Sequence, residues 1–170
     1  MKDYPIKFKL IVNDLLNNKM LNELAKYNQH LNSSRLEHCV DVAYLTFKLT
    51  SRLKLSADRI EEATQAALLH DLFLYDWRGD YSSFQHLLHH PLAAVMNARE
   101  ITNLNNRQEN IILSHMFPLA KTMPKSIEAW IVQYADKYSA IKEYAVQYYM
   151  MMKNSHVVGS LLALFLFMKK

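Results

Sequence analysis

Residues 56–71 read SADRIEEATQAALLHD, and this stretch decides the fold. Its apolar residues recur three and four positions apart, which predicts a helix that buries one face. Ala63 and Ala67 lie on the same face as His70, so a neighbouring backbone can approach closely beside the imidazole. The stretch ends in His70-Asp71, which places a base and an acid together where this inward helix ends.

Helical spacing and helix-start residues recur along the rest of the chain. They predict helices within 6–26, from Ser33 or Ser34 to about Leu53, from Ser56 to His70, from Pro91 to about Glu100, from Asn106 to His115, and from Ser126 to about Met150. Pro91 is expected in the first turn of its helix, and Asn106 is expected to form a capping box with Glu109. No segment alternates convincingly with period two, and glycine occurs only at Gly79 and Gly159. We therefore expect an all-α bundle of about six to seven helices.

Composition sets further limits on the chain. Its 170 residues suit one domain, and we expect residues 1–170 to form a single domain. Its motif-bearing core should span about 34–142, with N- and C-terminal helices packed on it. The net charge of +4 is spread along the chain, which argues against nucleic acid as the main partner. The single cysteine, Cys39, and an N-terminus without an apolar signal segment predict a reducing, cytoplasmic setting.

The most apolar run of the chain is Val157–Met168. It is about half as long as the ~20 residues that cross a bilayer, so we expect no membrane span. We interpret it as a packed C-terminal helix or as a subunit contact in a homo-oligomer. A role at a membrane surface is the less favoured alternative.

Several ionisable residues fall on faces that are otherwise apolar. His38 is followed at helical spacing by Val42 and Leu45, and Asp136 shares a stripe with Val132 and Ala140. A buried carboxylate is unfavourable unless a cation or strong hydrogen-bond donors compensate it. Convergence of such acids and imidazoles on a divalent metal explains the pattern, and nitrogen and oxygen ligands suit Zn, Mn, Fe, Ni or Co.

Each residue taken alone has a plainer interpretation. An inward histidine is more often a hydrogen-bonded core residue than a ligand. Asp136 alone could be the partner of a buried arginine, and Asp71 alone could accept backbone hydrogen bonds at a helix end. The metal hypothesis therefore depends on the joint pattern.

The order of these residues carries a resemblance to a known family. The matching pieces are His38-Cys-Val-Asp-Val-Ala, Ala67-Leu-Leu-His70-Asp71, His90-Pro91, Ser114-His115 and Ala135-Asp136-Lys137. Over about 34–142 the chain resembles the HD superfamily of metal-dependent phosphohydrolases. It is most similar to small bacterial HD proteins, which include hydrolases of diadenosine tetraphosphate.

The resemblance implies a set of metal ligands. In the family, the first histidine, the HD pair and the last aspartate bind one ion, which implies His38, His70, Asp71 and Asp136 here. Two further histidines bind a second ion in some members, which implies His90 and His115, with Asp71 bridging both ions and positioning a hydroxide. His90 is preferred to His86 and His89 because it directly precedes Pro91.

The resemblance also implies a reaction. The two ions would activate a water as hydroxide, which attacks the phosphorus of a phosphate ester or anhydride, with a nucleotide preferred. The HD pair is followed here by Leu72-Phe73-Leu74. One subgroup of the family has Ile-Gly at this place, and the diadenosine tetraphosphate hydrolases have a lysine there. This chain has neither. This run indicates a differently shaped pocket, so the substrate of those enzymes does not transfer.

Substrate contacts are predicted from charge and position. Arg78, Lys121, Lys137 and His86 are the candidates for binding the phosphate, and Arg35, one turn before His38, is a weaker one. Each cation could equally be a solvated surface charge, and His86 could be an exposed loop histidine.

Three other functions fit the same ligands. One is a di-iron oxygenase of the HD type, and another is an HD module that binds nucleotides without turning them over. The third is hydrolysis at a single ion, with His90 and His115 serving the substrate.

Overall fold

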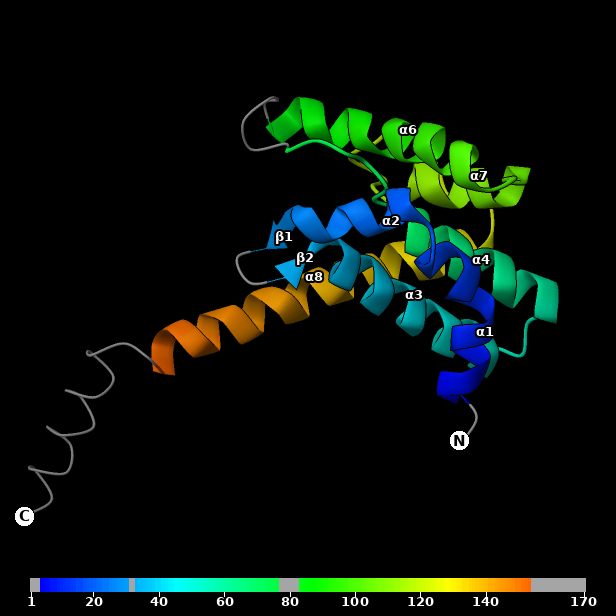
Figure 1. Ribbon diagram of the computed structural model, residues 1–170, viewed down its shortest axis with the longest axis horizontal. Helices are drawn as coiled ribbons and strands as arrows, with labels where there is room; N and C mark the ends of the chain where they lie inside the picture. The colour runs from blue at the N-terminus through cyan, green and yellow to red at the C-terminus, as the bar shows by residue number, and fades with distance from the viewer. Residues whose placement is uncertain (1–3, 31–32, 77–82, 154–170) are drawn as a thin grey trace, which may run out of the picture.

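The computed structural model describes residues 4–30, 33–76 and 83–153 (Figure 1). Its elements are α1 (Tyr4–Leu16), α2 (Lys19–Glu23), the 3₁₀-helix η1 (Leu24–Lys26), β1 (Asn28–His30), β2 (Ser33–Ser34), α3 (Arg35–Arg52), α4 (Ala57–Leu69), α6 (Ser83–Ile101), α7 (Asn106–Ser114) and α8 (Ile127–Lys153). Seven α-helices and one very short hairpin thus make up the described part of the chain. The predicted all-α class is confirmed.

Helix α3 lies at the centre of the bundle. It packs against both α4 and α8, while α7 packs against α4 and α8 and is covered by α6 (Figure 1). Helix α1 closes the opposite side, where Phe8 makes edge or tilted ring contacts with Tyr44 and Phe47 of α3. The buried faces of these helices form one apolar core.

Helix α3 begins at a complete capping box, which settles Ser34 rather than Ser33 as its cap. The Ser34 hydroxyl accepts from the Glu37 backbone N–H, and the Glu37 carboxylate accepts from the Ser34 N–H at 2.8 Å. These contacts satisfy backbone donors that a helix N-terminus otherwise leaves open. The cap therefore sets the position of His38, which lies in the first turns of the helix.

The predicted N-terminal helix within 6–26 is divided in two. Helix α1 ends at Leu16, and Asn18 caps the separate helix α2 by accepting a hydrogen bond from the Met20 N–H at 2.9 Å. An asparagine side chain competes for backbone hydrogen bonds and favours such caps over helix interiors.

Two predicted helix starts are wrong. Helix α6 begins at Ser83, so Pro91 lies inside it and not in its first turn. Proline has no N–H and therefore removes one hydrogen bond of the helix. Pro91 is buried, and its packing offsets the loss of that bond. The cap of α7 is Asn105 rather than Asn106, and its box partner is Gln108 rather than Glu109. This register buries Gln108 and leaves Glu109 to pair with Arg99.

A short antiparallel hairpin was not predicted. β1 pairs with β2 through Asn28 opposite Ser34 and His30 opposite Ser33. Strands of two or three residues are too short to show a period-two pattern. The hairpin matters because it carries Gln29 to the region where α3 and α4 meet.

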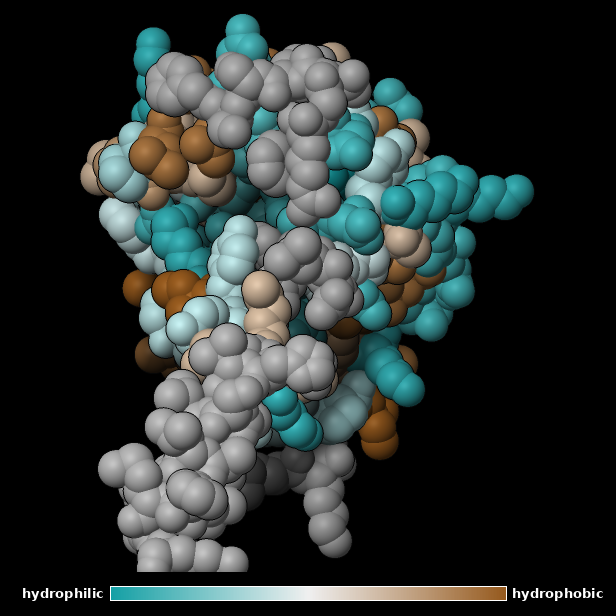
Figure 2. All heavy atoms as spheres, turned by 90° about the vertical axis from the view of Figure 1, so that its left-hand side faces the viewer, coloured by the Kyte–Doolittle hydropathy of each residue, from teal (hydrophilic) through white to brown (hydrophobic). Residues whose placement is uncertain are grey.

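The C-terminal half of α8 extends away from the bundle (Figure 1). The described side chains from Tyr144 to Met152 are exposed; the side chain of residue 147 is not among them. The face on the left of Figure 1 shows apolar residues scattered among hydrophilic ones (Figure 2). Among the described residues, no helix is long and apolar enough to cross a membrane. The apolar run Val157–Met168 lies outside the described residues.

Candidate metal centre

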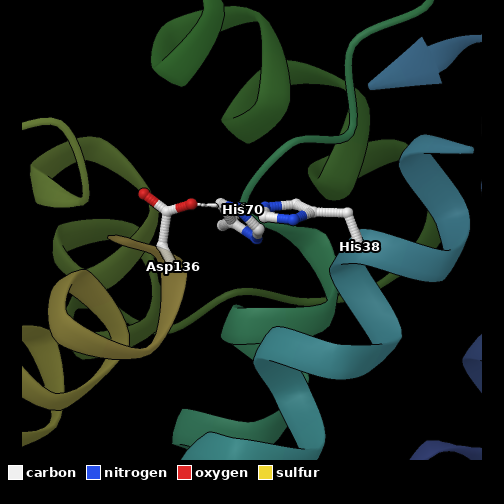
Figure 3. A group of neighbouring side chains, drawn as sticks. All are labelled: His38, His70 and Asp136. Atoms are coloured by element: carbon white, nitrogen blue, oxygen red, sulfur yellow. Dashed lines mark hydrogen bonds and ion pairs between the residues drawn. The ribbon is translucent and has the colours of Figure 1, made fainter. Parts of the chain in front are cut away.

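Three of the predicted ligands point toward one another from three different helices (Figure 3). His38 comes from the start of α3, His70 from the end of α4, and Asp136 from the middle of α8. The Asp136 Oδ1 atom lies 3.2 Å from His38 Nε2 and 3.7 Å from His70 Nε2. These ligand atoms lie close enough together to hold one ion.

A second group adjoins the first through Asp71. Asp71 Oδ1 lies 3.3 Å from His90 Nε2 of α6 and 3.5 Å from His115 Nε2 at the end of α7. Its other oxygen, Oδ2, lies 3.6 Å from His70 Nε2. Asp71 therefore presents one oxygen to each group, and the structure brings together all six side chains that the sequence nominated as ligands.

The backbone holds three of the imidazoles in one orientation. In each ring the Nδ1–H donates to a main-chain carbonyl: His70 to Ala67 at 2.8 Å, His90 to His86 at 2.9 Å, and His115 to Ile112 at 2.7 Å. His70 and His115 are the C-cap residues of α4 and α7, where helix carbonyls lack intrahelical donors. The Nε2 atoms are thereby directed into the cluster, which is the arrangement that metal-binding histidines adopt.

A carboxylate that the sequence analysis missed supports His38. The Nδ1–H of His38 donates to Glu143 Oε1 at 2.8 Å, and Ser33 donates to Glu143 Oε2 at 2.7 Å. Glu143 follows Asp136 by two turns of α8, so a search of that helix face could have found it. A carboxylate behind a histidine ligand orients the ring and makes it more basic.

The charges of the cluster favour a cation. Burial raises the carboxylate pKa values, but the neighbouring imidazoles outweigh it and hold the pKa of Asp71 and Asp136 well below their usual range. Burial lowers the pKa of His38, yet the hydrogen bonds to Asp136 and Glu143 raise it to about 10. Burial lowers the pKa of His90 to about 3, so this ring is neutral and offers a lone pair.

Several buried nitrogen and oxygen atoms of the cluster lack suitable hydrogen-bond partners and are placed as metal ligands would be. His70 Nε2 and Asp71 Oδ1 are buried without a hydrogen-bond partner among the described residues. His90 Nε2 and His115 Nε2 face each other at 2.9 Å, although the Nδ1 atom of each ring already carries the donor proton. Facing lone pairs and orphaned polar atoms are unfavourable unless a cation lies between them. The donor set therefore fits divalent transition metals.

A cavity of about 420 Å³ opens onto this cluster. His86 and Lys137, two of the predicted substrate contacts, line it together with Leu87, Met116 and other residues. Lys137 also donates from Nζ to the His115 carbonyl at 2.9 Å, which ties α8 to the end of α7.

The remaining predicted substrate contacts lie elsewhere. Lys121 is exposed in the segment between α7 and α8. It is not one of the described residues that line the cavity. Arg78 lies outside the described residues. Arg35 is fully buried and contacts protein groups instead of the cavity, so the weak suggestion that it binds phosphate is wrong. His89 is exposed, in keeping with the choice of His90.

The apolar residues after the HD pair shape the wall of the site. The Phe73 ring is buried and lies 4.9 Å from the ring of His86 and 5.4 Å from the ring of His90, measured between centroids. Tyr75 shares a hydrogen bond with His86 Nδ1 at 3.2 Å. This run thus packs against two histidines of the site.

Comparison with protein families gives a match to the HD domain. The match covers residues 35–141 and includes all six clustered side chains. No curated protein and no solved structure gives a significant match to the chain.

Replacing Glu143 tests its support of His38. Glu143→Gln should weaken binding of the first Mn²⁺ ion about tenfold, because the neutral amide makes the His38 ring less basic. Titration calorimetry on metal-free protein measures this affinity. Glu100→Gln, at an exposed position of α6, is the matched control and should bind as the wild type does. Equal affinities for all three proteins would contradict the role given to Glu143.

Proposed function

Since this chain belongs to the HD domain family, we propose that it is a metal-dependent phosphohydrolase with a dinuclear centre. The observation that carries the proposal is that His70 Nε2 and Asp71 Oδ1 are buried without a hydrogen-bond partner in the described part of the chain, next to two imidazole nitrogens that face each other. A protein interior keeps such an arrangement only when something positively charged compensates it.

The geometry supports two ion positions that share Asp71. The first would be held by His38, His70, Asp136 and Asp71, and the second by Asp71, His90 and His115. The ligand atoms of His38, His70 and Asp136 lie within 4.8 Å of one another, and so do those of His70, Asp71 and His115, so the two positions would adjoin. When bound, the ions would supply Lewis acidity that activates water and draws charge from phosphoryl oxygens.

The chain's own residues would bind and orient the substrate. The Lys137 ammonium stands at the cavity and can attract an anionic phosphate, and His86 lines the same wall. Leu87, Met116 and Leu119 form an apolar part of the lining. A cavity of about 420 Å³ has the size of a small-molecule site. A cationic end beside an apolar wall supports a phosphate ester or anhydride, with a nucleotide as the preferred substrate.

The setting of the enzyme is part of the same proposal. We infer one domain, because α1 packs its aromatic face onto α3 of the HD region. We also infer a reducing, cytoplasmic location, because the chain's one cysteine, Cys39, is a buried thiol of the core.

A substrate screen tests the proposed reaction. In the presence of Mn²⁺, Co²⁺, Ni²⁺, Mg²⁺ or Fe²⁺, purified protein should release phosphate from mononucleotides or split dinucleotides into two products. Asp71→Ala should lower this turnover by at least about a thousandfold because it removes the shared ligand. Asp41→Ala, at an exposed position of α3, is the control and should keep wild-type turnover.

The same screen separates the alternatives. Turnover that requires dioxygen would replace hydrolysis by an oxygenase reaction. Tight binding of a nucleotide with no turnover in the presence of any of the five metals would favour a binding module and would contradict the hydrolase proposal.

His115 distinguishes two ions from one. His115→Ala should lower activity about a hundredfold and reduce the bound metal from two ions to one per chain, without unfolding the protein. Metal content by plasma emission spectrometry and the circular dichroism melting curve measure both effects. Wild-type turnover in this variant would refute the second ion position.

The exposed end of α8 supports self-association. Tyr144, Val146, Tyr148, Tyr149, Met150, Met151 and Met152 are each between 43% and 67% exposed. Together they hold on the order of 700 Å² of side-chain surface, close to the roughly 800 Å² that each partner gives a standard interface. We propose that α8 of a second copy covers them.

Charges placed on this helix test the dimer. Wild-type protein should have twice the chain mass of 19.9 kDa by multi-angle light scattering, and the double variant Tyr148→Glu, Met151→Glu should be monomeric. Leu10→Glu, on the exposed face of α1, is the control and should remain dimeric. A monomeric wild type, or one that sediments with phosphatidylcholine vesicles, would contradict self-association.

A further inference from the structure

Arg35 is a charged side chain with no exposed surface. Its guanidinium lies 3.5 Å above the Phe73 ring and 4.9 Å from the Tyr27 ring. Nη1 donates to the Phe73 carbonyl at 2.6 Å, and Nε donates to Gln29 Oε1 at 3.1 Å. A buried guanidinium is tolerated when its donors are satisfied in this way.

Gln29 links Arg35 to the metal centre. Its amide oxygen accepts from Arg35, and its amide nitrogen donates to Asp71 Oδ2 at 2.8 Å. Arg35 has only donors and an ionised Asp71 only acceptors, so a single orientation of the amide satisfies both neighbours. The guanidinium therefore dictates that Gln29 presents an N–H group to the aspartate.

This contact decides how the Asp71 carboxylate is rotated. With Oδ2 held by Gln29 on the side of His70, Oδ1 must face His90 and His115. The Phe73 carbonyl, two residues further along, is held by the same guanidinium. Both the carboxylate and the backbone that follows it are thus fastened to one buried residue of α3.

We propose that Gln29 and Arg35 are positioning residues that hold Asp71 in the rotation required to bridge two ions, and that they thereby control the affinity of the second ion position. The inference rests on the dinuclear centre proposed above. Neither residue touches the reacting atoms in this role. The contact of Gln29 with the Asp71 carboxylate transmits their effect.

Two substitutions test the relay by metal binding instead of turnover. Gln29→Met keeps the length of the side chain and removes the N–H donor without adding a ligand. Arg35→Lys keeps the positive charge and removes the fork that orients the amide. Gln85→Met, at an exposed position of α6, is the matched control. Calorimetric titration of metal-free protein with Mn²⁺ gives both dissociation constants, and electron paramagnetic resonance detects coupling between the two ions.

We expect Gln29→Met to weaken the second ion about ten- to hundredfold while the first stays within about threefold of wild type. At the same ratio of added Mn²⁺ to protein, the magnetic coupling between the two ions should be lost in Gln29→Met. Arg35→Lys should change the second-ion affinity and the coupling in the same direction. Unchanged second-site affinity in Gln29→Met, or equal weakening of both ions, would overturn the relay while leaving the dinuclear centre intact. A wild type that binds a single ion would overturn both. If Arg35→Lys does not fold, Gln29→Met, at the cavity surface, decides alone.

Discussion

Two carboxylates, the buried Asp71 and the largely buried Asp136, are the constraint on which this structure depends. Each lies within 4 Å of at least two imidazole nitrogens, in a setting where an uncompensated charge is strongly unfavourable. The helices α3, α4, α6, α7 and α8 can pack together only if these charges are neutralised where they meet. A divalent metal bound among these side chains would satisfy that requirement, and the clustered histidines and aspartates are placed to hold one.

The contacts that end the helices also orient the ligands. The capping box of Ser34 and Glu37 begins α3 just before His38, and the rings of His70 and His115 close the last turns of α4 and α7. These bonds would form in a helical protein of any function, since helix termini need partners. Here they leave the Nε2 atoms directed inward. Stability and ligand geometry therefore come from the same hydrogen bonds.

A second layer of residues supports the clustered side chains. Phe73 follows the HD pair by two residues, and its ring contacts both Arg35 and the histidines His86 and His90 of α6. The apolar segment thus has a structural role, because the Phe73 ring and carbonyl both contact the buried guanidinium. Glu143 and Gln29 complete this layer from α8 and the hairpin.

Periodicity and helix caps, which are local properties of the chain, predicted the helical class and most helix positions. The resemblance to the HD superfamily implied the six side chains that lie together. The local patterns placed the starts of α6 and α7 wrongly, since burial of Pro91 and Gln108 outweighed local preference. Only the tertiary structure showed that Glu143 contacts His38 and that Gln29 contacts Asp71. Such contacts join residues 105 and 42 positions apart, and they depend on how separate elements pack, which no local pattern encodes.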